Sequence, residues 1–238
     1  PRRQGLEMTH HTLPHHHPHR DTLTRDTPQQ GIVQEMRLFS RTGARLYLTK
    51  AERHAYLRAV QDESPARALF CQLLHDTGCR PSEARETSAQ RVLWSEGLIV
   101  FRTLKKRRHD RRGREKLPEY RAVPVSWPLL ERLDRVFGIR RLQKDPDTLH
   151  TPLWTMSRST AYRLVKRVMA RAGIHGDQAT GKGLSHAYGV AMMTAARPVP
   201  IHLLAKAMGH SSTKTTEVYL RATGDEERNL FLAAWGDE

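Results

Sequence analysis

Apolar residues recur every three or four positions along most of the chain from Leu46 onward, which is the pattern of helices with one buried face. The first of these runs covers 50–60. It follows Thr49, whose hydroxyl can cap the first turn, and Glu52 stands where it completes a capping box. The same periodicity, bounded by Ser, Pro or Gly, predicts further helices over 65–78, 81–86, 126–137, 160–171, 184–196, 201–208, 213–222 and 226–235.

Three short segments are instead rich in branched and aromatic residues: 92–94, 98–102 and 121–125. Such runs favour β-strands, and their order predicts one small antiparallel sheet in which a long hairpin joins the second and third strands. No internal repeat is visible in the chain. The predicted fold class is therefore α+β, a mostly helical domain with a small antiparallel sheet on one side.

Residues 1–32 have no hydrophobic period, and we expect them to form a disordered arm that is basic and rich in histidine. Residues 33–48 are a lead-in segment, and the regular domain is expected over 49–238. Six of the fourteen histidines fall in the arm without the fixed spacing that a metal site needs, so we predict no metal site. These six are His10, His11, His15, His16, His17 and His19.

The chain carries 40 Lys and Arg against 25 Asp and Glu, a formal net charge of +15. An excess of this size attracts polyanions through counterion release, so nucleic acid is the expected partner. No apolar run reaches the ~20 residues that span a bilayer, which argues against a membrane protein. The polar N-terminus lacks the pattern of a signal peptide, and Cys71 and Cys79 are too few for a disulfide framework. We expect buried thiols in a protein of the bacterial cytoplasm, associated with the nucleoid.

Arg80 is the first candidate for a functional side chain. It follows Gly78, which ends the second predicted helix, in a short turn before the next one. An arginine held at such a corner can direct two N–H groups at one phosphate, and Glu83 lies three residues on, where it can brace the guanidinium. A surface arginine beside a helix end is the alternative interpretation, and Arg80 taken alone does not exclude it.

The loop between the second and third predicted strands is strongly basic. Residues 102–121 hold ten Lys or Arg and three acids, a net charge of +7. Such a run is usually a solvated face, but a basic hairpin can also lie in a DNA groove while a lysine at its base protonates a departing oxygen. Lys105 is the preferred lysine, and Lys106 is nearly as well placed. The residues expected to contact DNA are Lys106, Arg107, Arg108, Arg111, Arg112 and Arg114.

Three later segments carry further candidates. Lys182 and Ser185 lie in the sequence Gly-Lys-Gly-Leu-Ser-His, His210 lies in Gly-His-Ser, and Tyr219 follows His210 by nine residues. Helices on either side of a short turn would point His210 and Tyr219 into one cleft. A tyrosine hydroxyl in a positively charged cleft suggests attack on a phosphodiester. His186, beside Ser185, is interpreted as a packing residue.

In their order along the chain, these motifs resemble the catalytic pattern of the tyrosine recombinase (phage integrase) family over roughly residues 45–235. The pattern is Thr-Gly-x-Arg-x-x-Glu, a lysine on a β-hairpin, His/Lys-x-x-Arg, Gly-His-Ser and a tyrosine. Each motif is weak alone, whereas all five in order are specific. The resemblance implies the catalytic fold of that family for 49–238. The segments around the two lysine motifs look most like the small recombinases of plasmids and mobile elements.

The resemblance implies a role for each matching residue. Arg80 and His210 would contact the scissile phosphate, Lys182 would contact it or assist proton transfer, and Lys105 would be the general acid. Tyr219 would form a 3′-phosphotyrosyl ester and release a 5′ hydroxyl. Because that ester keeps the energy of the broken bond, neither ATP, a metal nor another cofactor is expected. The expected partners are double-stranded DNA and other copies of the chain assembled on it as a dimer or tetramer.

Ser185 departs from the family pattern, which has an arginine three residues after the His/Lys position. Serine is neutral and too short to fork onto a phosphate oxygen, and losing one such donor costs ~10²–10³ in rate. We expect weakened or abolished activity, either because the residue was altered or because a natural variant is feeble or rescued by Lys206 or Arg197. The alternative functions are an inactive DNA-binding protein on the same fold and a type IB topoisomerase-like enzyme.

The N-terminus is a second departure. Many family members carry a separate domain there that holds the opposite face of the DNA, and the polar, proline-rich residues of this arm predict no such domain. A single-domain enzyme and a fragment of a longer one fit this equally well. Near the other end, an apolar stripe either packs on its own domain or docks on a neighbouring copy. This stripe consists of Leu230, Phe231, Leu232 and Trp235.

Overall fold

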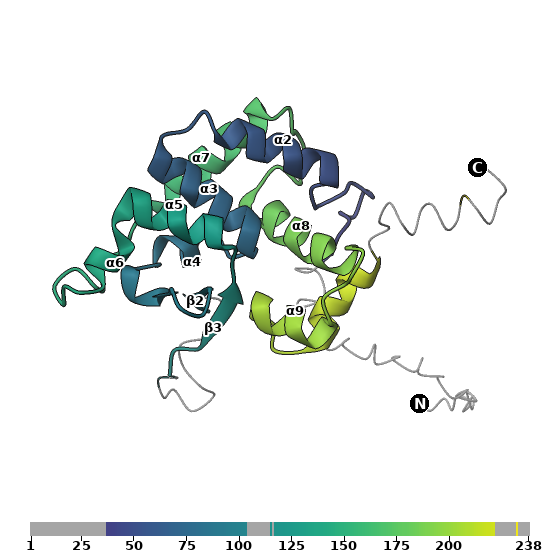
Figure 1. Ribbon diagram of the computed structural model, residues 1–238. Helices are drawn as coiled ribbons and strands as arrows, with labels where there is room; N and C mark the ends of the chain where they lie inside the picture. The colour runs from purple at the N-terminus through teal and green to yellow at the C-terminus, as the bar shows by residue number, and fades with distance from the viewer. Residues whose placement is uncertain (1–36, 104–114, 116, 222–231, 233–238) are drawn as a thin grey trace, which may run out of the picture.

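The computed structural model describes residues 37–103, 115, 117–221 and 232, and they form a mostly helical domain (Figure 1). The helices are α2 (Lys50–Val60), α3 (Pro65–Thr77), α4 (Pro81–Arg85), α5 (Trp127–Phe137), α6 (Ile139–Leu142), α7 (Arg158–Arg171), α8 (Gly181–Met193), α9 (Ile201–Met208) and α10 (Thr213–Thr216). The remaining elements are the 3₁₀ helices η1 (Ala89–Arg91) and η2 (Glu217–Arg221) and the strands β1 (Val92–Leu93), β2 (Leu98–Arg102) and β3 (Tyr120–Pro124). Within the described ranges, no helix has the length and apolar content needed to cross a bilayer.

Local signals explain where the first two helices begin and end. The backbone N–H of Glu52 donates to the Thr49 hydroxyl at 3.2 Å, and the N–H of Thr49 donates to the Glu52 carboxylate at 2.7 Å. The predicted capping box is therefore confirmed. Helix α3 ends at Gly78, which adopts the left-handed conformation (φ 62°) and donates its N–H to the Leu74 carbonyl.

Helix α3 forms the centre of the main hydrophobic core. Its residues Leu69, Phe70, Leu73 and Leu74 are fully buried, and the helix packs against α2, α5 and α8. In Figure 1, α2, α3, α5 and α7 occupy one half of the domain, while the sheet and α9 lie in the other half.

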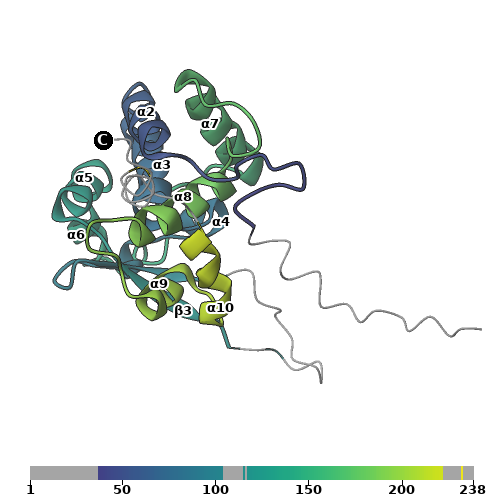
Figure 2. The same ribbon diagram turned by 90° about the vertical axis from the view of Figure 1, so that its right-hand side faces the viewer.

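A second, smaller hydrophobic cluster lies on the other side of α8. Figure 2 shows α8 between α3 and the α9–α10 segment, and α8 contacts α3, α9 and η2. Helix α8 therefore joins the two halves of the molecule. The buried residues of the second cluster are Leu38, Tyr47, Tyr188, Val190, Leu204, Met208 and Tyr219.

The three strands form an antiparallel sheet in the order β1-β2-β3, as predicted. Arg102 pairs with Tyr120 at the open end of β2 and β3, and the N–H of Thr103 donates to the Glu119 carbonyl at 2.8 Å. The predicted basic hairpin connects β2 and β3 in the sequence. Its predicted functional residues lie outside the described part of the chain: Lys105, Lys106, Arg107, Arg108, Arg111, Arg112 and Arg114.

Several element boundaries differ from the predictions. Helix α8 begins at Gly181 rather than at 184. The predicted helix over 213–222 is confirmed only in part, because α10 ends at Thr216 and the 3₁₀ helix η2 follows it. The short helix α6 was not predicted. The N-terminal arm and most of the predicted helix over 226–235 lie outside the described residues.

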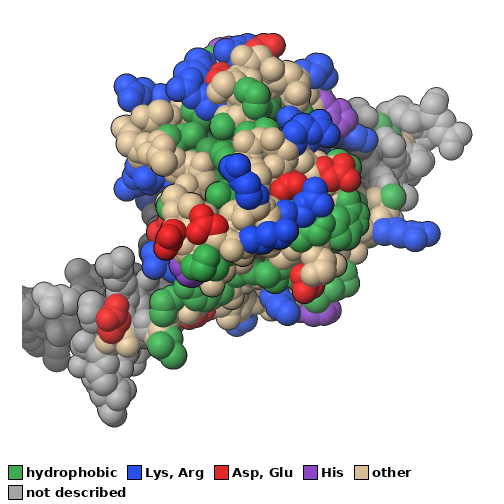
Figure 3. Space-filling model, turned by 60° about the vertical axis from the view of Figure 1, so that its left-hand side comes forward, with side chains coloured by type: hydrophobic (Ala, Val, Ile, Leu, Met, Phe, Trp, Pro, Cys, Tyr) green, Lys and Arg blue, Asp and Glu red, His purple; other side chains and the backbone are tan. Residues whose placement is uncertain are grey.

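The positive charge is not continuous over the whole surface. On the face drawn in Figure 3, Lys and Arg side chains alternate with Asp and Glu and with apolar side chains. Elsewhere among the described residues, Arg140 forms an ion pair with Asp134 at 2.8 Å and Arg102 forms one with Glu86 at 2.9 Å. Part of the positive charge is therefore neutralised locally.

Candidate active site

Five of the six residues predicted to act in catalysis meet in one cavity of about 440 Å³. They come from the turn before α4, from the first turns of α8, from the segment after α9 and from η2. The sixth, Lys105, lies outside the described residues. The five that line the cavity are Arg80, Lys182, Ser185, His210 and Tyr219.

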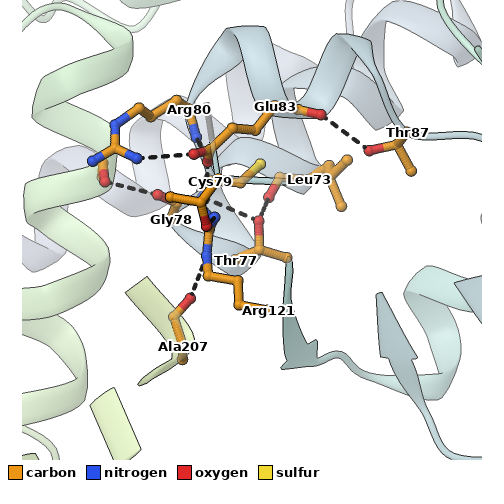
Figure 4. Close-up of polar contacts among 11 residues, drawn as sticks. Leu73, Thr77, Gly78, Cys79, Arg80, Glu83, Thr87, Arg121 and Ala207 are labelled. Atoms are coloured by element: carbon orange, nitrogen blue, oxygen red, sulfur yellow. Dashed lines mark hydrogen bonds and ion pairs between the residues drawn. The ribbon is translucent and has the colours of Figure 1, made fainter. Parts of the chain in front are cut away.

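Arg80 is held by its neighbour in the next helical turn (Figure 4). Its Nη1 donates to Glu83 Oε1 at 2.8 Å, and its backbone N–H donates to Glu83 Oε2 at 2.9 Å. The Glu83 side chain is fully buried, whereas the Arg80 side chain is 31% exposed and lines the cavity. The predicted bracing contact is therefore present, and it leaves the guanidinium accessible to an anion.

A second arginine, Arg121 on β3, binds the same carboxylate from the opposite side. Its Nη2 donates to Glu83 Oε2 at 2.6 Å, and its Nε donates to the Ala207 carbonyl at 2.8 Å. Burial raises the pKa of the Glu83 carboxyl, but the hydrogen bond and charge of Arg121, with a smaller effect from Arg80, outweigh it and leave the pKa below its ordinary value. Glu83 is therefore an ionised carboxylate between two guanidinium groups.

Sequence reasoning missed Arg121 and counted it only within the charge of the hairpin. Only a partial signal was present: Arg121 lies two positions before Val123, hence on the same face of the strand, and both are buried, but this spacing does not identify the partner. An arginine at an inward position of a strand needs a buried partner of opposite charge.

Two glycines allow close approaches in the first turn of α8, one to α4 and one to the segment that precedes α8. A Cβ at Gly181 would lie 2.6 Å from Pro81 Cγ, and one at Gly183 would lie 1.8 Å from the Gln178 carbonyl oxygen. The Thr180 hydroxyl caps the helix by accepting the Gly183 N–H at 3.0 Å. Lys182 is consequently fixed in the first helical turn on the wall of the cavity.

Ser185 takes part in a structural hydrogen bond. Its hydroxyl donates to the Gly78 carbonyl at 2.7 Å, across 107 positions of sequence. Gly78 also lies under the Tyr188 ring, since a Cβ there would be 2.6 Å from Tyr188 Cδ1. The residue at the expected second-arginine position thus ties α8 to the turn that carries Arg80.

Tyr219 lies beneath the cavity and is 1% exposed. Its hydroxyl is 3.3 Å from His186 Nδ1, and its ring stacks on His210 with centroids 6.4 Å apart. Burial raises the pKa of the Tyr219 hydroxyl well above its ordinary value, although the positive charge of Arg80 opposes this shift. The His210 ring is itself held by the Thr216 hydroxyl, 2.7 Å from Nδ1. Tyr219 is therefore a protonated phenol between two imidazoles.

The interpretation of His186 as a packing residue was incomplete. Its side chain is buried, as a packing residue would be, but it also contacts the predicted nucleophile and lines the cavity. His186 stands four residues after Lys182, one helical turn further along the same face, and this spacing was the available signal. Cys71 and Cys79 are buried free thiols, as expected.

Comparisons with known proteins identify similar sequences and folds. Residues 47–226 match the family described as the phage integrase family. Over 180 residues the chain is 24% identical to the tyrosine recombinase XerA of Pyrococcus furiosus, covering 74% of this chain and 57% of that protein.

Solved structures share the fold. A crystal structure of the XerH site-specific recombinase bound to its palindromic difH substrate has a TM-score of 0.61 at 18% identity, covering 80% of this chain and 52% of that one. A structure of the Tn1549 transposon integrase with a circular intermediate DNA has a TM-score of 0.57 at 16% identity, covering 82% and 67%. This chain therefore corresponds to about half to two thirds of the length of these relatives.

Proposed function

The chain belongs to the phage integrase family, and from this premise we propose that it is a site-specific DNA recombinase that cuts and rejoins DNA through Tyr219. The observation that carries the proposal is the cavity itself, in which Arg80, Lys182, His210 and Tyr219 converge from segments far apart in the sequence. The partners proposed are double-stranded DNA and further copies of the chain; binding to DNA is supported by the solved complexes of XerH with its difH substrate and of the Tn1549 integrase with a circular intermediate DNA. An origin on a plasmid or another mobile element is part of the same proposal.

The cavity supports binding of one phosphodiester. Arg80 would place two N–H groups on a non-bridging oxygen, because Glu83 fixes its orientation without occupying all of its donors. Lys182 and His210 line other parts of the wall and would contact the remaining oxygens. These groups would offset the negative charge that builds up on the phosphorus oxygens in the transition state.

In the reaction proposed, the Tyr219 oxygen attacks phosphorus and forms a 3′-phosphotyrosyl bond while the bond from phosphorus to the 5′ oxygen breaks. Lys105, at the start of the hairpin, would give its proton to that leaving oxygen. The Tyr219 proton must leave during the attack, because burial keeps the hydroxyl protonated beforehand. The reverse reaction, with a 5′ hydroxyl of another strand as nucleophile, completes strand exchange.

Ser185 is the observation that points to weakened catalysis. The serine hydroxyl is directed to the Gly78 carbonyl and adds no positive charge to the cavity. Arg197 and Lys206, the cations considered as substitutes, are both exposed and are absent from the residues found to line the cavity. Arg85 and Arg158 do line it. We propose an enzyme of low turnover, and a DNA-binding protein without catalysis is the second candidate that Ser185 favours.

Covalent capture on DNA tests the proposal. The purified chain is incubated with a library of nicked duplexes of random sequence, denatured with detergent, and the DNA that stays attached is sequenced. A phosphotyrosyl bond at Tyr219, identified by mass spectrometry of the digested adduct, is the expected result. The Tyr219→Phe variant is the matched control, since it removes only the hydroxyl.

The outcomes separate the candidate functions. Adducts on a recurring sequence, with strand exchange between two such sites, support a recombinase. Relaxation of supercoiled plasmid without exchange would instead indicate a topoisomerase. DNA binding of both the original chain and Tyr219→Phe, with no adduct from either, would overturn the proposal in favour of a DNA-binding protein.

A further inference from the structure

One guanidinium contacts three segments that carry the predicted catalytic groups. Arg121 lies on β3, its Nη2 binds Glu83 next to Arg80, and its Nε binds the Ala207 carbonyl three residues before His210. Its Nη1 is 3.5 Å from the hydroxyl of Thr103, at the base of the basic hairpin. Figure 4 shows Arg121 reaching toward Ala207 on one side, close to the Arg80–Glu83 turn.

The burial of this pair makes its geometry strict. The Arg121 side chain is 4% exposed and that of Glu83 is 0% exposed, so neither charge can be satisfied by bulk water. A buried carboxylate and a buried guanidinium remain charged only when each keeps its hydrogen bonds. Movement of any one of the three segments would therefore break a contact that the others cannot replace.

The close packing of the guanidinium extends to the turn before His210. Gly209 adopts a left-handed conformation (φ 68°), and a Cβ at that position would lie 3.1 Å from Arg121 Cδ. The Phe101 ring covers Arg121, with the guanidinium carbon 5.4 Å from the ring centroid. Arg121 is thus enclosed by β2, α4 and the end of α9.

We infer that Arg121 is a positioning residue that sets Arg80, His210 and Thr103, directly after β2, relative to one another. The side chain is not among the residues found to line the cavity, so it acts through Glu83, Ala207 and Thr103 rather than by touching DNA. This inference rests on the proposed function for its effect on rate. Its structural part, the coupling of three segments, does not depend on that function.

Hydrogen–deuterium exchange of the full chain tests the coupling. The Arg121→Met variant removes the donors while keeping a long apolar side chain, and we expect faster exchange in all three segments, 78–83, 101–103 and 205–210. The matched control is Arg167→Met, which removes the 2.6 Å ion pair between α7 and Glu63, remote from the cavity. It should leave those three segments unchanged. Faster exchange confined to β3 in Arg121→Met would overturn the inference.

Single-turnover cleavage separates positioning from simple stability. The substrate is a duplex recovered by covalent capture. Arg121→Met should lower its cleavage rate at saturating DNA by ~10²-fold, because small displacements of reacting groups have effects of this size. The Kd for DNA should change little. In a Glu83→Gln background the same change should have a much smaller effect, since Arg121 acts through that carboxylate. Arg121→Lys, which keeps the charge but has one donor group, should recover part of the rate.

Two outcomes would show a role in stability alone. In the first, the rate falls only by the fraction of protein that is unfolded. In the second, Arg121→Met lowers the rate equally with Glu83 present and in the Glu83→Gln background. If the original chain forms no adduct with any DNA, the proposed function fails. The exchange experiment then decides the inference by itself, because it needs neither DNA nor catalysis.

Discussion

The hydroxyl of Tyr219 and Nδ1 of His186 lie 3.3 Å apart, joining η2 to α8 across 33 positions of sequence. Burial keeps the phenol protonated, so the Tyr219 hydroxyl donates to Nδ1 in the tautomer of His186 that carries its hydrogen on Nε2, and accepts from Nδ1–H in the other tautomer. In the first tautomer the predicted nucleophile is hydrogen-bonded to a nitrogen that can accept its proton.

A double-mutant cycle should detect this bond. We expect His186→Leu and Tyr219→Phe each to lower the free energy of unfolding, and their combination to cost less than the sum by about 0.5–1.5 kcal/mol, the usual net value of such a hydrogen bond. Urea denaturation of the four proteins measures the coupling. Additive effects would show that the two groups do not interact in solution.

Ser185→Arg should raise the yield of covalent Tyr219–DNA product, by up to ~10²–10³-fold if the arginine reaches the phosphate as a preorganised donor. The matched control is Ser185→Ala, which also removes the bond to Gly78 but adds no charge. Alanine should lower the free energy of unfolding by about 0.5–1.5 kcal/mol without raising the yield. Equal yields from the arginine variant and the original chain would contradict the assignment of position 185.

Gly189 allows α8 to approach the Tyr219 ring. A Cβ at residue 189 would lie 2.4 Å from Tyr219 Cζ, so Gly189→Ala should displace the ring and destabilise the fold by about 1–3 kcal/mol. In a Tyr219→Ala background the clash disappears, and the same substitution should stabilise by up to about 1 kcal/mol through helix propensity. Thermal or urea denaturation checks the change of sign, and a destabilising effect in both backgrounds would refute the explanation.

Alkaline pH should destabilise the protein through its buried thiols. Burial raises the pKa of Cys79 from 9.0 to about 12 and that of Cys71 to about 11. Between pH 9 and these values the unfolded chain loses protons that the folded chain keeps. The stability contributed by the thiols is complete below pH 9 and declines as pH rises, by on the order of 1.4 kcal/mol per pH unit for each thiol.

The variant Cys79→Ala should therefore show a shallower decline in unfolding free energy above pH 9, measured by urea denaturation under reducing conditions. Cys71→Ala should differ from the original chain over a narrower range, ending near pH 11. The buried tyrosines cancel in the comparison with Cys79→Ala, whereas Tyr56 interacts with Cys71, so Cys71→Ala also changes the titration of Tyr56. Identical slopes for the three proteins would exclude the thiols as the cause.

Features set by neighbouring residues were predictable from the sequence. The capping box of Thr49 and Glu52 and the glycine end of α3 depend on groups within four residues, and both agree with the structure. The order of the motifs along the chain was also sufficient to identify five cavity residues.

Features set by distant contacts were not predictable. Gly181 and Gly183 weaken a helix by their own propensity, and only the closeness of Pro81 and Gln178 explains why α8 includes them. Arg121 resembled its neighbours in a basic run, because its partner Glu83 lies 38 positions away. The hairpin lysine stays a prediction.

The hydrogen bond from Ser185 to Gly78 constrains which substitutions position 185 can accept. The serine hydroxyl has a partner in the turn before Arg80. An arginine at this position would add a cation to the cavity but leave the Gly78 carbonyl without that donor. Under the proposed function, selection for recombination and selection for folding would therefore oppose each other at one codon, and an arginine there would require a second, compensating substitution near Gly78.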